Sequence, residues 1–205
     1  MAKRITKKIN LKVLDISHHN NIVSFQKIFD FGIRGVILKS TQGSHYVDPT
    51  YDRRVKQARD AGLLTGAYHF ATGDNVEAQV RNMINVVEMD DKTLVALDYE
   101  PNRASEMNIE QCREFFELMD TQLGRKTVLY SGNLIKETLN KPDPIICNRK
   151  LWLAQYGSSY VLPVGFADAW LWQYAERGAV PGIGGAIDHN SFDGSDEDLA
   201  AEWAE

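Results

Sequence analysis

The chain has 205 residues, of which 43% are hydrophobic and 25% charged, and this composition is ordinary for a globular protein with one sizeable core. Its formal net charge of -5 gives no broad electrostatic case for nucleic acid or an anionic membrane as the main partner. No stretch approaches the ~20 apolar residues of a membrane span, and two cysteines are too few for a disulfide framework or a four-thiolate zinc site.

The first ten residues hold the only basic run of the chain, Lys3-Arg4 with Lys7-Lys8. The segment Ile9-Asn10-Leu11-Lys12 follows it, and this is not the long apolar segment of a secretory signal peptide. We therefore expect residues 1–10 to be a solvated lead-in to a single domain over residues 1–205.

Apolar runs of strand length then alternate with helical patterns. Ser24 can cap the first helix and Gly32 can end it, Pro49 is acceptable in the first turn of the second, and Gly124 can end the fourth. The predicted strands are 12–17, 35–40, 65–70, 94–100 and 126–130, and the predicted helices that follow them are 24–31, 49–61, 75–88, 109–123 and 134–139.

The alternation of strands and helices ends at Pro142 and Pro144, which mark a loop. Three strands then follow without helices between them, at 151–156, 169–174 and 186–190, and Ser195 can cap a last helix over 196–203. Strands that alternate with helices imply parallel pairing, and eight strands suggest closure. The sequence predicts an α/β fold, a barrel in which five strands carry helices and three do not. An open doubly wound sheet is the alternative, but no glycine-rich phosphate turn follows the first strand.

Two carboxylates end the fourth strand, where Leu94-Val95-Ala96-Leu97 runs into Asp98-Tyr99-Glu100 before Pro101. Strand side chains alternate, so Asp98 and Glu100 point to one face and Tyr99 to the other. Two acids roughly 6 to 7 Å apart along a strand suit glycoside hydrolysis, in which one donates a proton and the other stays ionised. We assign the protonated role to Glu100 on the premise that it is the most desolvated acid.

Polar and aromatic residues gather at the ends of the other strands as well. The carboxyl ends of barrel strands share one face, so these residues should form one acidic cleft with aromatic walls, which suits a polysaccharide. They are Asp15, His18, His19, Lys39, Thr41, Gln42, Tyr68, His69, Phe70, Tyr130, Trp152, Gln155, Tyr156, Trp172, Gln173, Tyr174, Asp188, His189 and Asn190.

Eight segments of the chain that contain these strand-end residues resemble, in order, the motifs of the glycoside hydrolase family 25 lysozymes. The resemblance implies an N-acetylmuramidase that cuts the β-1,4 bond between N-acetylmuramic acid and N-acetylglucosamine in peptidoglycan, on a flattened TIM-like (β/α)5(β)3 barrel. The segments are Asp15-Ile16-Ser17-His18-His19, Lys39-Ser40-Thr41-Gln42-Gly43, Gly66-Ala67-Tyr68-His69-Phe70, Leu97-Asp98-Tyr99-Glu100, Leu129-Tyr130-Ser131, Leu151-Trp152-Leu153-Ala154-Gln155-Tyr156, Trp172-Gln173-Tyr174 and Asp188-His189-Asn190.

The resemblance also implies the roles of the residues. Glu100 matches the general acid, Asp98 matches the nucleophile or the group that orients the substrate acetamido, and Asp15 and Asp188 match two further acids that tune the pair and hold substrate. The residues expected to line the sugar sites are Tyr68, Phe70, Tyr130, Trp152, Gln155, Tyr174 and Asn190. The chain departs from the family at Gln42, where glutamate is common, and near Asn20-Asn21, where a Gln-Gly pair is common.

Two other functions remain open at this point. His18, His19 and His69 with Asp15, Asp98 and Asp188 would supply a metal-dependent deacetylase or amidase, although no H-E-x-x-H helix is present. A glycan-binding barrel without turnover is the second alternative. We expect no cofactor and no metal, no nucleic-acid partner and no membrane insertion, and a monomer that binds peptidoglycan glycan strands. Synthesis in the cytoplasm without a recognisable signal peptide, and action on the cell wall after release or secretion, complete the expectation.

Overall fold

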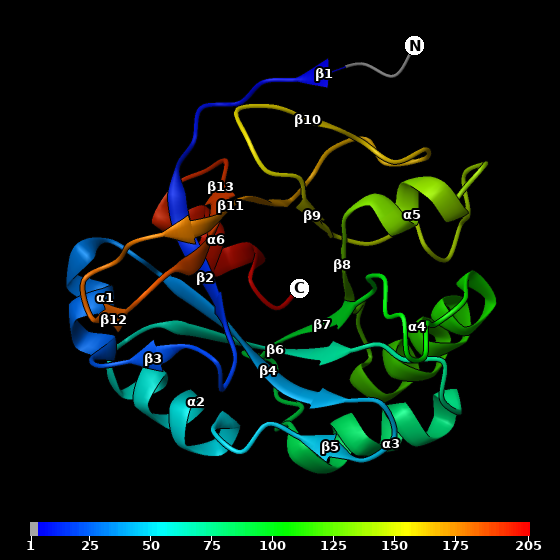
Figure 1. Cartoon of the computed structure of the whole chain (residues 1–205), viewed down its shortest axis with the longest axis horizontal. Helices are drawn as coiled ribbons and strands as arrows, with labels where there is room; N and C mark the ends of the chain where they lie inside the picture. Colours follow the sequence, from blue (N-terminus) through cyan, green and yellow to red (C-terminus); the bar gives the residue numbers. More distant parts are fainter. Residues whose placement is uncertain (1–3) are drawn as a thin grey trace.

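Eight strands close into a barrel in the computed structural model, which describes residues 4–205 (Figure 1). Strand β2 pairs with both β4 and β13, and this pairing joins the two ends of the sheet. In order around the barrel the strands are β2 (Leu11–Ile16), β4 (Gly35–Gln42), β6 (Leu64–Phe70), β7 (Leu94–Asp98), β8 (Val128–Ser131), β9 (Leu151–Ala154), β11 (Leu171–Gly178) and β13 (Ile187–Phe192). The predicted eight-stranded barrel is confirmed.

Helices connect the first six barrel strands, which run parallel to one another, and the last three strands have no helices between them. Each predicted helix is present within two residues of its expected ends. They are α1 (Phe25–Phe31), α2 (Tyr51–Asp60), α3 (Val76–Val86), α4 (Ile109–Leu123), α5 (Asn133–Thr138) and, after the barrel, α6 (Asp196–Glu202). Ser24 and Asn108 accept backbone hydrogen bonds as N-caps, and Gly32 and Gly124 end their helices with the positive φ that glycine allows.

Five short strands lie outside the ring of eight. They are β1 (Arg4–Ile5), β3 (Asn21–Ile22), β5 (Tyr46–Val47), β10 (Tyr160–Val161) and β12 (Ile183–Gly184). Strand β5 adds to β4, β12 pairs with β3, and β1 pairs with β10 near the N-terminus (Figure 1).

The N-terminal segment from residue 4 onward packs against the barrel, whereas we expected a solvated lead-in. Besides the β1–β10 pairing, Lys7 Nζ lies 2.6 Å from Asp168 Oδ2, and the Asn10 side chain donates to the carbonyls of Phe192 and Gly194. Residues 1–3 of the predicted lead-in lie outside the described residues.

Asp188 lies near the amino end of β13, whereas the strand-end argument placed it at a carboxyl end. This strand is antiparallel to both β2 and β11, because the segment between β11 and β13 returns as a hairpin without a crossover helix. The amino end of β13 therefore lies at the end of the barrel where the parallel strands finish, and Asp188 pairs in register with Asp15. Strand β11 also continues four residues beyond its predicted end, to Gly178, as an arm of this hairpin.

Alternation along the strands separates two hydrophobic clusters. On β7, Leu94 and Ala96 belong to the cluster that fills the barrel, while Val95 and Leu97 belong to the cluster between the strands and the helices. Trp203, which is 2% exposed, belongs to the first cluster and donates its indole N–H to the Thr65 carbonyl at 2.8 Å. A Cβ at Gly35 would lie only 2.6 Å from the Trp203 ring, so β4 needs glycine there.

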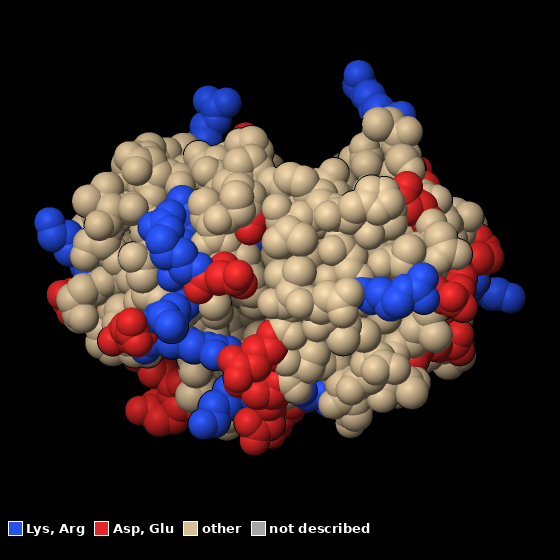
Figure 2. Space-filling view, turned by 90° about the horizontal axis from the view of Figure 1, so that it is seen from below, with Lys and Arg blue, Asp and Glu red and all other residues tan. Residues whose placement is uncertain are grey.

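The surface gives no sign of a large region of one charge on the face shown in Figure 2, where Lys and Arg side chains lie among Asp and Glu. Among residues 4–205, no helix combines the length and the apolar character that crossing a membrane requires.

Replacing Trp203 with alanine should lower the free energy of unfolding by about 3–5 kcal/mol, because it leaves a cavity at the barrel interior and an unpaired Thr65 carbonyl. Urea unfolding followed by circular dichroism measures this loss. Phe31→Ala is the control, since Phe31 is 51% exposed on α1 and should cost less than about 1 kcal/mol. Equal losses in the two variants would contradict the assignment of Trp203 to the core.

Candidate active site

The inner face of β7 changes from apolar to acidic at the end of the strand. Asp98 follows Leu94 and Ala96 on this face, and Glu100 follows just beyond the strand, while the intervening Tyr99 is fully buried in the outer cluster. Both acids line one cleft of about 280 Å³. Its lining consists of Asp15, Tyr68, Asp98, Glu100, Tyr130, Trp152, Tyr156, Gln173, Glu176 and Asp188. The structure thus brings together the four predicted acids and three of the predicted sugar-binding residues.

The Asp15 carboxylate is held by two amides. Its Oδ2 atom accepts hydrogen bonds from Gln173 Nε2 at 2.9 Å and from Asn190 Nδ2 at 2.8 Å. Burial raises the pKa of Asp15, and these two hydrogen bonds oppose the rise because they stabilise the ionised form.

Asp188 has a strongly raised pKa beside Asp15. Burial and the charge of Asp15 raise the pKa of Asp188 to about 8, and the nearby Glu176 adds to the effect. A hydrogen bond between the two carboxyl groups adds to the rise of the Asp188 pKa and opposes the rise of the Asp15 pKa.

Asp98 is more buried than Glu100, so the premise that Glu100 is the most desolvated acid is wrong. Asp98 is 6% exposed, and its pKa is raised well above the usual value by burial first and by the charges of Glu100 and Asp15 next. Glu100 is half-buried, and burial followed by the charge of Asp15 raises its pKa. The Oδ1 atom of Asp98 is buried and has no hydrogen-bond donor among the described residues.

The aromatic walls are tied to Asp15 through the same two amides. Tyr130 donates its hydroxyl to Gln173 Oε1 at 3.0 Å, and Trp152 donates its indole N–H to Asn190 Oδ1 at 2.6 Å. The two rings meet edge to face with their centroids 4.5 Å apart. Asp15 therefore fixes the positions of two walls of the cleft through these hydrogen bonds.

Four predicted sugar-binding residues do not line the cleft. The Gln155 carboxamide oxygen accepts from Lys136 Nζ at 2.6 Å and from the Val161 N–H at 3.0 Å, which ties down the segment after β9. Tyr174 and Asn190 turn toward other partners, His189 and Asp15, and the Phe70 ring lies under Lys39. The carboxyl end of a strand thus holds both cleft residues and residues that bind neighbouring loops.

Three residues that line the cleft were not among the predicted site residues. Two of them, Tyr156 and Gln173, belonged to the strand-end residues, and that position was the sequence signal for them. Glu176 had no such signal, because it lies in the part of β11 that extends beyond the predicted strand.

The histidines of the metal hypothesis do not face the acids. His69 is fully buried, with Nδ1 2.8 Å from Thr41 Oγ1 and Nε2 3.1 Å from Gln79 Oε1, and burial lowers its pKa to about 4. His18 Nδ1 lies 3.0 Å from Asp48 Oδ2. Within residues 4–205 no three His, Cys, Asp or Glu side chains form a group that could hold a metal ion.

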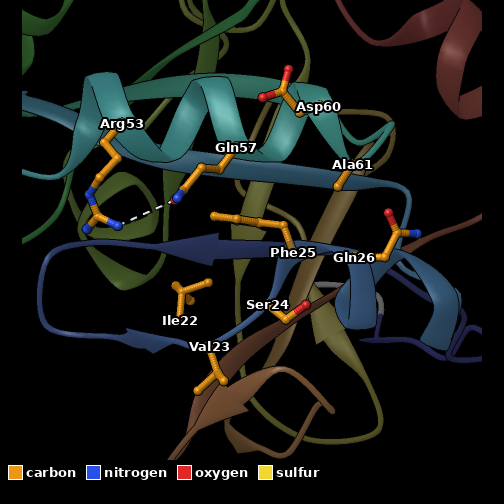
Figure 3. A pocket seen from close by; sticks show the side chains of 9 residues that line it. All are labelled: Ile22, Val23, Ser24, Phe25, Gln26, Arg53, Gln57, Asp60 and Ala61. Carbon is orange, nitrogen blue, oxygen red and sulfur yellow. Dashed lines mark hydrogen bonds between the residues drawn. The ribbon is translucent and has the colours of Figure 1, made fainter.

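A second hollow lies outside the barrel, between the start of α1 and helix α2 (Figure 3). Arg53 donates to Gln57 at 3.4 Å on one side, and Ile22, Val23 and Phe25 lie on the other. Asp60 is the one carboxylate among its lining residues, so the hollow lacks the acid pair that glycoside hydrolysis requires.

Two carboxyl groups of unlike burial, at the strand ends of a barrel and between aromatic walls, make up the kind of site that defines a glycoside hydrolase. The sequence profile described as glycosyl hydrolases family 25 matches residues 14–183. The chain belongs to this family. The predicted family and the predicted enzyme class, a lysozyme-type glycosidase, are thereby confirmed.

Individual relatives agree with the family. The chain is 29% identical over 98% of its length to the uncharacterized protein YegX of Escherichia coli K12, covering 76% of that protein. It is 28% identical over 92% of its length to lysozyme M1 of Streptomyces globisporus, covering 69% of it. The crystal structure of the lysozyme from Streptomyces coelicolor superposes with a TM-score of 0.85 at 26% identity, covering 95% of this chain and 97% of that one.

Asp188→Asn should raise the stability of the protein at neutral pH and flatten its dependence on pH. The folded pKa of Asp188, about 8, exceeds the unfolded value of ~3.9, so wild-type stability falls as pH rises from about 4 to 8. Asparagine keeps a donor toward Asp15 and does not ionise. After allowance for solvent screening of this partly exposed group, the gain at pH 7 should be about 1–2 kcal/mol.

Urea unfolding at a series of pH values from 4.5 to 8 measures the effect. If wild type and Asp188→Asn lose stability with the same slope over this range, Asp188 is not the proton carrier of the pair.

Proposed function

We propose that the chain hydrolyses the β-1,4 bond between N-acetylmuramic acid and N-acetylglucosamine in peptidoglycan, with Glu100 and Asp98 as its catalytic pair. One observation carries the proposal: both acids project from one strand end into one cleft with aromatic walls. Membership of the family and the lysozymes among the relatives support the choice of substrate.

Glu100 acts as the general acid. It is the less buried member of the pair, so a glycosidic oxygen entering the cleft can reach it. Burial and the charge of Asp15 raise the pKa of Glu100, which favours the protonated form that can donate to the leaving oxygen.

Asp98 orients the acetamido group of the substrate. A buried carboxylate oxygen without a donor is unfavourable, and an N-acetylated sugar brings an N–H that can satisfy it. An acetamido group held in this way can attack the anomeric carbon through its carbonyl oxygen, and the ionised Asp98 then stabilises the positive charge that develops. Direct attack by Asp98 is the alternative role, and it needs the same carboxylate to face the sugar carbon.

The walls hold the sugar rings. Tyr68, Tyr130 and Trp152 offer ring surfaces along the cleft, and Tyr156, which is 51% exposed, extends the wall toward solvent. Aromatic rings pack against the apolar faces of sugars, while the carboxylates and Gln173 bond to hydroxyl groups. The chain works on glycan strands of the cell wall as a monomer.

Glu100→Gln should lower kcat by 10²- to 10⁴-fold, the usual contribution of a general acid, while the fold stays intact. Asp98→Asn should be nearly as damaging. Release of reducing ends from purified peptidoglycan gives the rate, and mass spectrometry of the fragments should find N-acetylmuramic acid at the reducing end. Glu114→Gln, on the exposed face of α4, is the matched control with wild-type activity expected.

A rate for Glu100→Gln above about a tenth of wild type would remove the acid assignment. Fragments that end in N-acetylglucosamine, or free stem peptides, would remove the muramidase proposal and favour a glucosaminidase or an amidase. Binding without any fragment release by the wild type would favour the glycan-binding barrel.

Attack by the acetamido group predicts retention of configuration, because two successive inversions occur at the anomeric carbon. An NMR time course on a defined peptidoglycan fragment should therefore show the β anomer first, before it equilibrates with the α anomer. An α anomer that forms first indicates direct attack by water and contradicts the proposed role of Asp98.

A further inference from the structure

Lys39 lies in the same layer of the barrel as the catalytic acids. On β4, Ile37 belongs to the cluster that fills the barrel, and Lys39 follows two residues later on the same face. In register it pairs with Tyr68, a residue of the cleft, and the next strand in the sheet is β7, which carries Asp98. A cation therefore stands where the neighbouring strands contribute acids and aromatic rings.

The contacts of Lys39 leave its charge without an ion-pair partner. Its Nζ atom donates to Gln42 Oε1 at 2.6 Å and lies 4.7 Å from the centre of the Phe70 ring and 5.6 Å from that of Tyr46. Within residues 4–205 no carboxylate oxygen is within 4.0 Å of this atom. A neutral amide and two rings fix the position of the ammonium group without neutralising its charge.

The surroundings of Lys39 are strongly acidic. Five carboxyl groups line the cleft, and none of its described lining residues is Lys or Arg. The charged groups that act on Lys39 are Asp98 and Glu100 from the end of β7 and Asp48 beyond β5, while the neighbouring His69 on β6 is neutral at pH 7. Burial lowers the pKa of Lys39, and the three carboxylates oppose this.

The effect on the acids has a definite sign. The pKa of Asp98 is raised by burial and by Glu100, that of Glu100 by burial and by Asp15, and in both cases the charge of Lys39 works in the lowering direction. Without an opposing cation, the crowded carboxyl groups would keep their protons to higher pH, which works against the ionised form that the proposed role of Asp98 needs.

We propose that Lys39 is a positioning residue that keeps the Asp98–Glu100 pair in its singly ionised state, and that the neutral side chain of Gln42 leaves the Lys39 charge free to act across the cleft. The inference deepens the proposed function, because it rests on the roles given there to Asp98 and Glu100. It makes Gln42 a determinant of the working pH of the enzyme.

Gln42→Glu tests the proposal with the fewest changes of shape. The new carboxylate would meet Lys39 Nζ at the distance of the present hydrogen bond and neutralise its charge. Both limbs of the pH profile of kcat/KM should then move upward by about half a pH unit. Lys39→Met, which keeps an unbranched side chain one atom shorter and removes the charge, should move both limbs upward by about one pH unit.

Two variants separate charge from packing. Lys39→Arg keeps the charge, so its pH profile should stay within about 0.2 pH units of wild type. Lys56→Met removes one positive charge from the exposed face of the outer helix α2, and it should leave the profile unchanged at the same ionic strength.

Titration of the side-chain carboxyl carbons by ¹³C NMR in the free enzyme gives a readout that does not depend on turnover. The titration midpoints of Asp98 and Glu100 should rise in Gln42→Glu and in Lys39→Met, in the same order as the kinetic shifts. If the wild type cuts no glycan, the proposed function fails, and the NMR midpoints still decide whether Lys39 acts on the pair.

The proposal is overturned if the midpoints and both kinetic limbs of Gln42→Glu and Lys39→Met stay within about 0.2 pH units of wild type. It is also overturned if Lys39→Arg shifts as far as Lys39→Met, because the effect would then come from packing of the side chain and not from its charge.

Discussion

The buried carboxylate of Asp15, held by two amide donors, is the interaction on which the cleft depends. A carboxylate only accepts hydrogen bonds, so Gln173 and Asn190 must both turn their NH₂ groups toward it. Their oxygens are thereby left to accept from Tyr130 and Trp152. A single carboxyl group on β2 thus fixes the orientation of side chains on four other strands, and these side chains form the walls of the cleft.

The same charge distributes protons among the other acids. The charge of Asp15 contributes to the rise of the Asp188 pKa to about 8, and it works in the same direction on the pKa values of Glu100 and Asp98. Unequal burial alone would make Asp98 the more strongly protonated member of the proposed catalytic pair, which is opposite to its proposed role. Burial raises the pKa of each acid, whereas access decides which acid a substrate can reach. The charge of Lys39 makes a third contribution, to the pKa values of both acids.

The sequence predicted the features that local rules determine. Alternation along residues 94–100 placed Asp98 and Glu100 on one face, and capping residues located the helices. The direction of β13 was not predictable in this way, because hairpin and crossover connections differ in what the intervening chain packs against. The position of the Gln155 side chain was not predictable either, because its partners Lys136 and Val161 come from other segments. Strand ends locate a site, but long-range partners decide which of their side chains face it.

On the inner face of the barrel, a layer of acids directly follows the apolar side chains that stabilise the fold. Below Asp98 the same face of β7 carries Ala96 and Leu94 among close-packed apolar side chains. At the level of Asp98 this face carries crowded acids, and one Asp98 carboxylate oxygen has no hydrogen-bond donor among residues 4–205, which is unfavourable for a buried polar atom. A substrate that brings an N–H to this oxygen removes part of that cost only when its acetamido group lies beside the reacting carbon. On the proposed role of Asp98, binding in the reactive orientation is thereby favoured over other orientations, and this preference would contribute to selection of an N-acetylated sugar.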